Sequence, residues 1–168
     1  MAKSSVNRKQ RRSAAPDETP EALRSRTMRA VKSKDTGPEM IVRRFLHAAG
    51  LRYRLHDGRL PGKPDLVFPG RRVALFVHGC FWHQHPSCPA AARPKSSSDY
   101  WTRKLDGNVA RDARHQDELT AAGWTVLIIW ECQTRNLDAL RELLVRLRAC
   151  PAMTVASRRP LIAPSTTA

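Results

Sequence analysis

The sequence has no apolar run long enough to cross a bilayer, and its basic first 20 residues are not followed by an apolar stretch. These absences predict a cytoplasmic protein without a membrane span or a secretory signal. Cysteine is scarce, with four residues among 168. In a reducing compartment such thiols are more often metal ligands or buried small side chains than disulfides. A chain of this length can bury a core without covalent cross-links.

Acidic residues are half as numerous as basic ones, with 15 Asp and Glu against 30 Lys and Arg and a net charge of +15. An excess of this size and sign attracts phosphate polyanions, so nucleic acid is the first partner to expect. A membrane surface would attract the same charge. We expect no membrane partner, because the sequence offers no amphipathic basic helix that is free of core residues.

The chain divides into three parts by composition. Residues 1–18 are basic and have almost nothing to bury, which predicts a disordered arm. We expect the folded domain to span residues 19–150, and residues 151–168 to form a disordered polar tail. No internal repeat is visible.

Hydrophobic periodicity predicts the elements of the folded part. The first two are a short helix from Thr19 to Val31 and a helix from the Thr36–Glu39 capping box to Gly50. A β-meander over residues 51–79 and an irregular loop over residues 80–98 follow. The last three are a long helix capped by Ser98 and Asp99 that ends at Gly123, a fully buried central strand at residues 125–130, and a closing helix over residues 137–147. This order predicts an α/β fold, a single domain with a mixed central β-sheet flanked by helices.

Three cysteines and one histidine have the chemistry of a structural zinc site. Cys80, His85 and Cys88 lie within nine residues, and Cys132 follows the predicted buried strand. Three thiolates and an imidazole fit tetrahedral zinc with no open position. The alternative is that the cysteines are buried thiols and His85 faces solvent. The loop's lack of apolar residues favours the metal, and Cys150 lies outside the set.

Acidic and imidazole groups at the predicted hairpin suggest phosphodiester hydrolysis. Asp65 begins one strand while Val77 and His78 end the next, so a hairpin would bring them to one edge. A carboxylate can hold a divalent cation, and His78 or His83 can move a proton near neutral pH. Taken alone, Asp65 is explained as a turn residue after proline, and the capping box explains Glu39 without catalysis.

Aromatic side chains stand in polar and basic surroundings at two places. Phe81 and Trp82 are adjacent in the irregular loop, and Trp101 lies in the first turn of the long helix, whereas Trp124 and Trp130 are assigned to the core. Neighbouring aromatics cannot both face one core, and a basic setting favours stacking on bases or insertion between them. Insertion costs least at a mismatch, so we expect a preference for mismatched DNA.

Five motifs in the right order resemble the very-short-patch repair (Vsr) mismatch endonucleases of bacteria. They are RTMRAVKSKDTGPE, LPGKPDLV, FVHGCFWHQH, NVARD and GWTVLIIWEC, and the match runs from about Ser25 to Cys132. The resemblance implies a fold like that of type II restriction endonucleases. It also implies a magnesium-dependent nick 5′ to the thymine of a G·T mismatch left by deamination of 5-methylcytosine.

The resemblance further implies a role for each matching residue. Asp65 would bind Mg²⁺ by its side chain and Val77 by its backbone carbonyl, His83 would be the general base, and His78 and Glu39 would support the site. Zn²⁺ would be held by Cys80, His85, Cys88 and Cys132. Three aromatic residues, Phe81, Trp82 and Trp101, would intercalate between bases. Three further residues, Met28, Lys104 and Asn108, would face the mismatch or its flanks. The family also implies a monomer, mismatch-repair proteins as transient helpers, and a cytoplasmic, nucleoid-associated location in a bacterium.

The sequence departs from the family pattern at three points. Val77 stands where Thr is usual, Gln84 interrupts a run that is often all histidine, and one extra residue separates His85 from Cys88. The second acid and lysine of restriction enzymes are not apparent after Asp65. Two alternatives stay open: a restriction-type nuclease acting on matched duplex DNA, and a zinc-stabilised DNA-binding module that does not cut.

Overall fold

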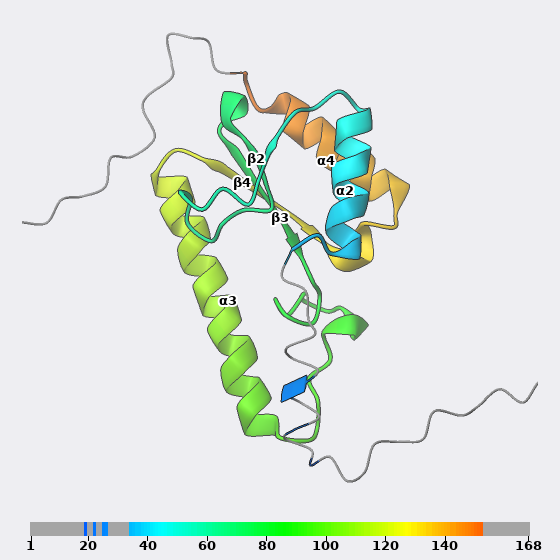
Figure 1. The fold of residues 1–168 in the computed structure, drawn as a ribbon, viewed down its shortest axis with the longest axis vertical. Helices are drawn as coiled ribbons and strands as arrows, with labels where there is room; N and C mark the ends of the chain where they lie inside the picture. The colour runs from blue at the N-terminus through cyan, green and yellow to red at the C-terminus, as the bar shows by residue number, and fades with distance from the viewer. Residues whose placement is uncertain (1–18, 20–21, 23–24, 27–33, 153–168) are drawn as a thin grey trace, which may run out of the picture. The chain divides into compact units, whose positions relative to one another are not determined.

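Four strands form a mixed sheet in the computed structural model, which describes residues 19, 22, 25, 26 and 34–152 (Figure 1). The strands are β1 (Arg54–Leu55), β2 (Leu66–Phe68), β3 (Val73–His78) and β4 (Thr125–Trp130), in the spatial order β1-β2-β3-β4. The first three are antiparallel neighbours, and β4 runs parallel to β3. The expected meander and the mixed α/β fold are therefore confirmed.

Helices cover both faces of this sheet. The α-helices are α2 (Gly37–Ala48), α3 (Ser98–Ala121) and α4 (Leu137–Ala149), and short 3₁₀ turns occur at η1 (Pro69–Arg71), η2 (Pro89–Ala91) and η3 (Glu131–Gln133). Figure 1 shows α2 and α4 together on one side of the sheet and α3 on the other. The lower half of α3 in Figure 1 extends past the end of the sheet, beside the loop that follows β3.

The alternation of side chains along β3 divides the core into two clusters. Val73 and Leu75 pack with residues of α2 and α4, whereas Ala74 and Phe76 pack on the opposite face with Leu119 of α3. A strand covered on both faces needs apolar residues at every position, which explains the uninterrupted run from Val73 to Phe76.

The start of α2 shows one half of the predicted capping box, the cap by Thr36, whereas the Glu39 carboxylate does not return to the Thr36 N–H. Thr36 has an extended backbone, and its hydroxyl oxygen accepts a hydrogen bond from the Glu39 N–H at 3.4 Å. Pro38 lies in the first turn, where its missing N–H costs nothing. After the last turn, Gly50 has φ +83°, a left-handed conformation that favours glycine. This helix fixes Glu39 at its first turn.

Two sequence predictions about secondary structure are wrong. The strand at residues 125–130 is at an edge of the described sheet instead of its centre, because only β3 pairs with it. It is also only partly buried: Val126 and Ile128 are half-buried and Thr125 is exposed. The cap of α3 also differs, since Ser98 is its first residue and the preceding Ser97 caps it with a left-handed backbone and no side-chain hydrogen bond to the helix.

Several predictions fall on parts of the chain outside the described residues. These are the basic arm at residues 1–18, Met28 with most of the expected first helix, and nearly all of the tail from residue 151. The α/β fold described here belongs to a unit that begins at Lys34. The domain limits of 19 and 150 therefore stay a prediction. Within the described part of the chain, every helix is too short or too polar to serve as a membrane span.

Candidate active site and Cys/His cluster

Asp65 lies at the edge of the sheet where β2 begins and β3 ends. Its Oδ2 accepts a hydrogen bond from the Val77 N–H at 2.7 Å, which confirms that the hairpin joins these two positions. Burial raises the pKa of Asp65 to about 6, and this hydrogen bond opposes the rise. The charge of Glu39 raises the pKa further, while those of His56 and His83 lower it. The Asp65 side chain is 21% exposed, and a partly buried carboxylate so perturbed has the character of a functional group.

Glu39 is almost completely buried beside Asp65, with 2% of its surface exposed. Its Oε1 lies 3.1 Å from Nε2 of His56 and accepts a hydrogen bond from Arg43 at 3.3 Å. The other ring nitrogen of His56, Nδ1, lies 4.0 Å from Oδ1 of Asp65. Helix capping therefore does not explain Glu39, because its carboxylate contacts His56 and Arg43 instead of the backbone of Thr36. Sequence reasoning missed His56, because it ends an unremarkable run of polar and apolar residues.

Two histidines stack on one another beyond the end of β3. The rings of His78 and His83 have centroids 3.9 Å apart and are nearly parallel, at 9°. Nδ1 of His83 lies 2.6 Å from Oδ2 of Asp112 in α3. His78 is buried, and burial, helped by the nearby His83, lowers its pKa to about 4. His78 is therefore neutral at neutral pH, and the His83–Asp112 pair is the group equipped to transfer a proton.

Sequence reasoning also missed Asp112, although a signal was present in the motif NVARD. Asp112 follows the buried Asn108 by one helical turn and so lies on the same face of α3. An acidic residue on the face of a helix that packs against the rest of the fold is unusual and indicates a specific partner.

The four predicted zinc ligands come together as one cluster, made of Cys80, His85, Cys88 and Cys132. All four ligand atoms lie within 4.8 Å of one another, and Nδ1 of His85 is 3.6 Å from the Cys80 sulfur and 3.4 Å from the Cys132 sulfur. The ring of His85 stacks on Trp130 at 4.2 Å, which fixes its orientation. Burial raises the pKa of the Cys80 thiol to about 11. Cys150, in contrast, caps the end of α4.

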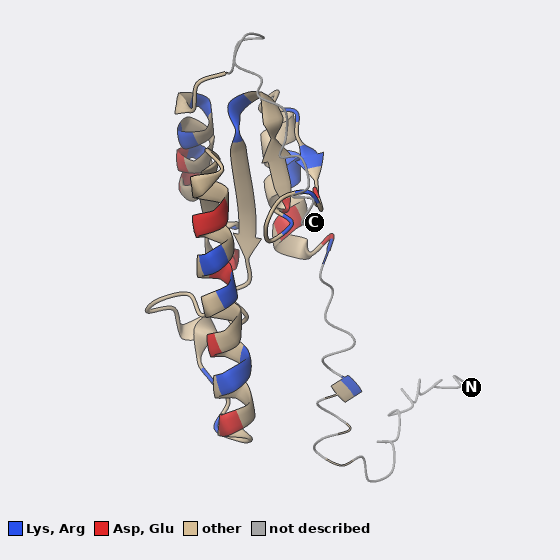
Figure 2. Ribbon diagram, turned by 90° about the vertical axis from the view of Figure 1, so that its left-hand side faces the viewer, with Lys and Arg blue, Asp and Glu red and all other residues tan. Residues whose placement is uncertain are grey.

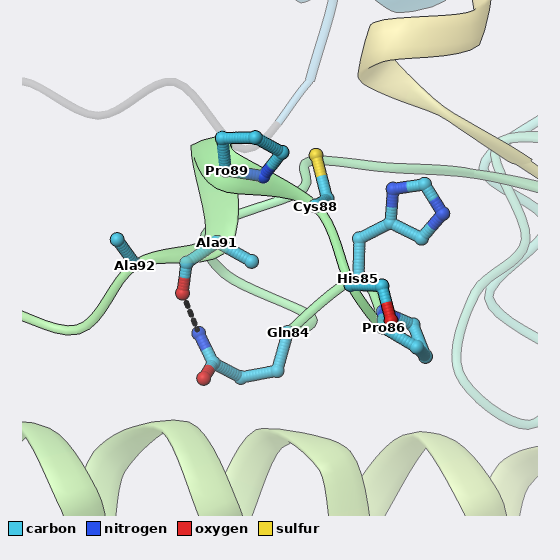
Figure 3. Close-up of a pocket in the computed structure, with 8 residues that line it drawn as sticks. Gln84, His85, Pro86, Cys88, Pro89, Ala91 and Ala92 are labelled. Atoms are coloured by element: carbon cyan, nitrogen blue, oxygen red, sulfur yellow. Dashed lines mark hydrogen bonds between the residues drawn. The ribbon is translucent and has the colours of Figure 1, made fainter.

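The loop that carries this cluster is held to α3 by polar side chains. The Gln84 amide donates hydrogen bonds to the carbonyls of Phe81, at 2.7 Å, and Ala91, at 3.2 Å. Arg93 donates to the Gln84 carbonyl at 2.7 Å and forms an ion pair with Asp106 of α3. Figure 3 shows the Gln84 side chain directed away from the sulfur of Cys88, across an open hollow in the loop. Gln84 thus fixes the loop on the side opposite the cluster.

The three aromatic residues predicted to contact DNA lie together, as Phe81, Trp82 and Trp101. We call them the aromatic cluster; their ring centroids are 4.9–6.2 Å apart, and all three are partly exposed. The Asn108 amide donates to the Trp82 carbonyl at 3.0 Å and is only 8% exposed. Lys104 is exposed on α3. DNA contacts by these residues, and by Met28, stay predictions.

The positive charge is not distributed evenly over these elements. Residues 34–97 contain eleven Lys and Arg against four Asp and Glu, whereas α3 contains four against five. Figure 2 shows basic and acidic turns alternating along α3. Within residues 34–152, the excess of basic side chains that can attract a phosphate backbone is therefore concentrated in the stretch that also carries Glu39 and Asp65.

The partly buried carboxylate of Asp65, the His83–Asp112 pair and the partly exposed aromatic cluster fit the endonucleases, a class of protein that binds and hydrolyses a polyanionic substrate. Residues 16–89 match the family model described as DNA mismatch endonuclease Vsr. The chain is 52% identical over 113 residues to the type II nicking enzyme V.XorIIP of Xanthomonas oryzae, an alignment that covers 67% of this chain and 82% of the relative.

Two other relatives agree with this match. Identity is 44% over 124 residues to the type II nicking enzyme V.NmeAIP of Neisseria meningitidis, covering 74% of this chain and 88% of the relative. It is 40% over 121 residues to the DNA mismatch endonuclease Vsr of Escherichia coli, covering 72% and 77%. The chain belongs to the Vsr family of endonucleases.

Proposed function

We propose that the protein is a magnesium-dependent endonuclease that nicks one strand of duplex DNA on the 5′ side of the thymine in a G·T mismatch and so initiates very-short-patch repair. The observation that carries this proposal is the position of Asp65 beside the His83–Asp112 pair, with Phe81 and Trp82 of the aromatic cluster on the same loop as His83. This arrangement unites a hydrolytic group with side chains suited to insertion at a mismatch.

Asp65 and Val77 fit a divalent cation. The hydrogen bond from Val77 occupies Oδ2 of Asp65 and leaves Oδ1 to act as a ligand. The N–H and C=O of one strand residue point to the same side, so the Val77 carbonyl faces the same edge as Asp65. In this proposal residue 77 binds the cation only through its backbone carbonyl, so Val77 can replace the Thr that is usual at this position. Magnesium, when bound, offsets negative charge on the phosphate.

His83 is the group that we assign as general base. Asp112 accepts a hydrogen bond from its Nδ1, which fixes the tautomer and leaves Nε2 free to accept a proton from water. His78 stacks on its ring and, being neutral, restricts its orientation without adding a competing charge. Glu39 supports Asp65 from the first turn of α2.

The aromatic cluster supplies the selectivity for a mismatch in this proposal. Its three rings contact one another edge-on and are already partly exposed, so they can insert between bases without exposing the protein's core. A G·T pair stacks less tightly than a Watson–Crick pair and is opened at lower cost.

We infer that the Cys/His cluster binds a structural zinc ion. With Zn–S near 2.3 Å and Zn–N near 2.0–2.1 Å, tetrahedral geometry separates sulfur from nitrogen by about 3.5 Å. The two sulfur–nitrogen distances of 3.4 and 3.6 Å agree with this value. Four protein ligands leave no open position for catalysis. The extra residue between His85 and Cys88 does not prevent the four side chains from meeting.

The decisive test is a nicking assay on end-labelled duplexes that differ only in G·T or A·T at one position, in several sequence contexts. We expect a single nick 5′ to the mismatched thymine that requires Mg²⁺. Equal cutting of the matched duplex would instead indicate a restriction-type nuclease, and binding without cutting would indicate a DNA-binding module. Either result would overturn the proposal.

Asp112→Asn should lower the nicking rate by about 10²–10⁴-fold, because the loss of the carboxylate removes the group that orients His83 and stabilises its protonated form. Single-turnover rates at saturating enzyme measure this step directly, and duplex affinity should change little. Asp117→Asn, an exposed acid on the same helix, is the matched control. A normal rate in Asp112→Asn would exclude His83 as a base that depends on this partner.

A further inference from the structure

His56 lies directly opposite Asp65 across the β1–β2 pair. The register pairs Leu55 with Leu66, so the next residues outward along the two antiparallel strands are His56 and Asp65. The His56 N–H donates to the Asp65 carbonyl at 3.3 Å and continues the ladder by one step. The backbone thereby fixes the distance between the two residues, whatever their side chains do.

The imidazole of His56 lies between two acidic side chains that come from different elements. Glu39 is supplied by α2 and Asp65 by the start of β2, and the ring reaches Glu39 with Nε2, at 3.1 Å, and Asp65 with Nδ1, at 4.0 Å. Among the described residues, it is the one basic side chain with nitrogens within 4.0 Å of both carboxylates. Arg43, the other basic partner of Glu39, does not approach Asp65 to this distance.

The hydrogen bonds of the His56 ring do not account for its position. Nε2 of His56 is shielded from solvent and, despite its short distance from Glu39, makes no hydrogen bond of acceptable direction. The side chain as a whole is 15% exposed, but Nε2 itself has almost no surface accessible to solvent. A buried polar atom without an aligned partner is uncommon in a folded protein and indicates a group whose partners rearrange or become complete in another state.

The Glu39 side chain is 2% exposed and that of Asp65 is 21% exposed, so their charges repel one another unless positive or dipolar groups separate them. We propose that His56 is a positioning residue of the nicking reaction, which joins Glu39 to Asp65 and holds both carboxylates in the arrangement that a divalent cation at Asp65 requires. This inference rests on the proposed function of the site. His56 does not contact the scissile phosphate in this role; it acts through Asp65 and Glu39.

The test compares three substitutions of His56 in the full-length protein. His56→Ala removes both ring nitrogens. His56→Gln retains a nitrogen near the position of Nε2, within reach of Glu39. His56→Asn retains one near Nδ1 and also tolerates the left-handed backbone at this position, φ +47°. His47→Ala, on the exposed part of α2, is the control.

We expect His56→Ala to weaken divalent-ion affinity by about 10–100-fold, the range typical of residues that orient metal ligands. The Mg²⁺ concentration for half-maximal nicking should rise accordingly, with little change in duplex affinity or melting temperature. His56→Gln should restore most of the lost affinity, and His56→Asn less. Calorimetric titration of the DNA-free protein with Mn²⁺ alone gives the same affinity independently of activity.

The proposal would be overturned if His56→Ala bound Mn²⁺ with wild-type affinity, or if its affinity and melting temperature fell together and His56→Gln restored neither. If the wild-type protein failed to nick any mismatched duplex, the proposed function would fail. The Mn²⁺ titration would still decide whether His56 positions a cation site. The two failures are therefore distinguishable.

Discussion

Asp65→Asn should abolish nicking and, in magnesium-free buffer near pH 8, should make the protein more stable than wild type. The loss of activity follows from the removal of the charged ligand. The gain in stability follows from burial, which raises the pKa of Asp65 from 3.8 to about 6. Its ionised form is thus disfavoured in the folded state, and the amide removes that cost while it can still accept the hydrogen bond from Val77.

The sign of the pH dependence makes this prediction specific. A carboxyl group with a raised pKa stabilises the fold below its unfolded pKa, and the contribution is lost as the pH rises through about 6. The shift corresponds to at most about 3 kcal/mol, so we expect a gain of roughly 1–3 kcal/mol at pH 8 and almost none at pH 4. Urea unfolding at both pH values, without Mg²⁺, measures the difference.

Asp57→Asn is the matched control for this experiment. Its hydrogen bond with Arg59 lowers the pKa of Asp57, so its charged form is favoured in the folded state. The substitution should therefore destabilise the protein at pH 8, opposite in sign to Asp65→Asn. A loss of stability in Asp65→Asn at pH 8, or nicking at the wild-type rate, would contradict our assignment of Asp65 as a metal ligand whose ionised form is disfavoured in the folded protein.

Cys132→Ser should remove the zinc ion and, with it, the ordered conformation of residues 80–98. Binding of structural zinc contributes about 10–16 kcal/mol in zinc-finger peptides, so the loss is expected to exceed that of any single packing contact here. Phe81, Trp82 and His83 lie on this loop, and we therefore expect nicking to disappear as well. Zinc content by atomic emission, melting temperature and nicking rate measure the three effects.

Cys150→Ser provides the comparison with a thiol outside the cluster. Cys150 is half-buried at the end of α4, and its thiol donates only to the Arg146 carbonyl. This variant should retain about one zinc ion per chain and full activity. If Cys132→Ser kept its zinc and its melting temperature, the cluster would be a group of reduced thiols without a metal, the alternative that the sequence left open.

Local patterns predicted those parts of the fold that depend on neighbours in sequence. The Thr36 cap correctly predicted the start of α2, although the reciprocal Glu39 bond of a capping box does not form, and the predicted hairpin correctly joined Asp65 to Val77. The edge position of β4 could not be predicted in the same way. Its β-branched run indicates burial, but the choice of neighbours in a sheet depends on tertiary contacts between distant segments.

The contacts that complete the candidate site show the same limit. His83 and Asp112 are 29 residues apart, and only the packing of α3 against the loop brings them to 2.6 Å. His56 and Glu39 meet because α2 packs beside the start of β2, which no local spacing encodes. The Cys/His cluster was predictable as a set, since the chemistry of its side chains limits the possible partners.

The two ends of α3 lie in different surroundings, one in the hydrophobic core and the other in the aromatic cluster. Leu119 lies in the core near the C-terminal end, whereas Trp101 lies some 27 Å away at the other end, given a rise of about 1.5 Å per residue. If Trp101 contacts DNA as we propose, mutations near it would alter which distortions of DNA the protein accepts without loosening the packing around Leu119. Substrate preference and the stability of the fold would then evolve almost independently along one helix.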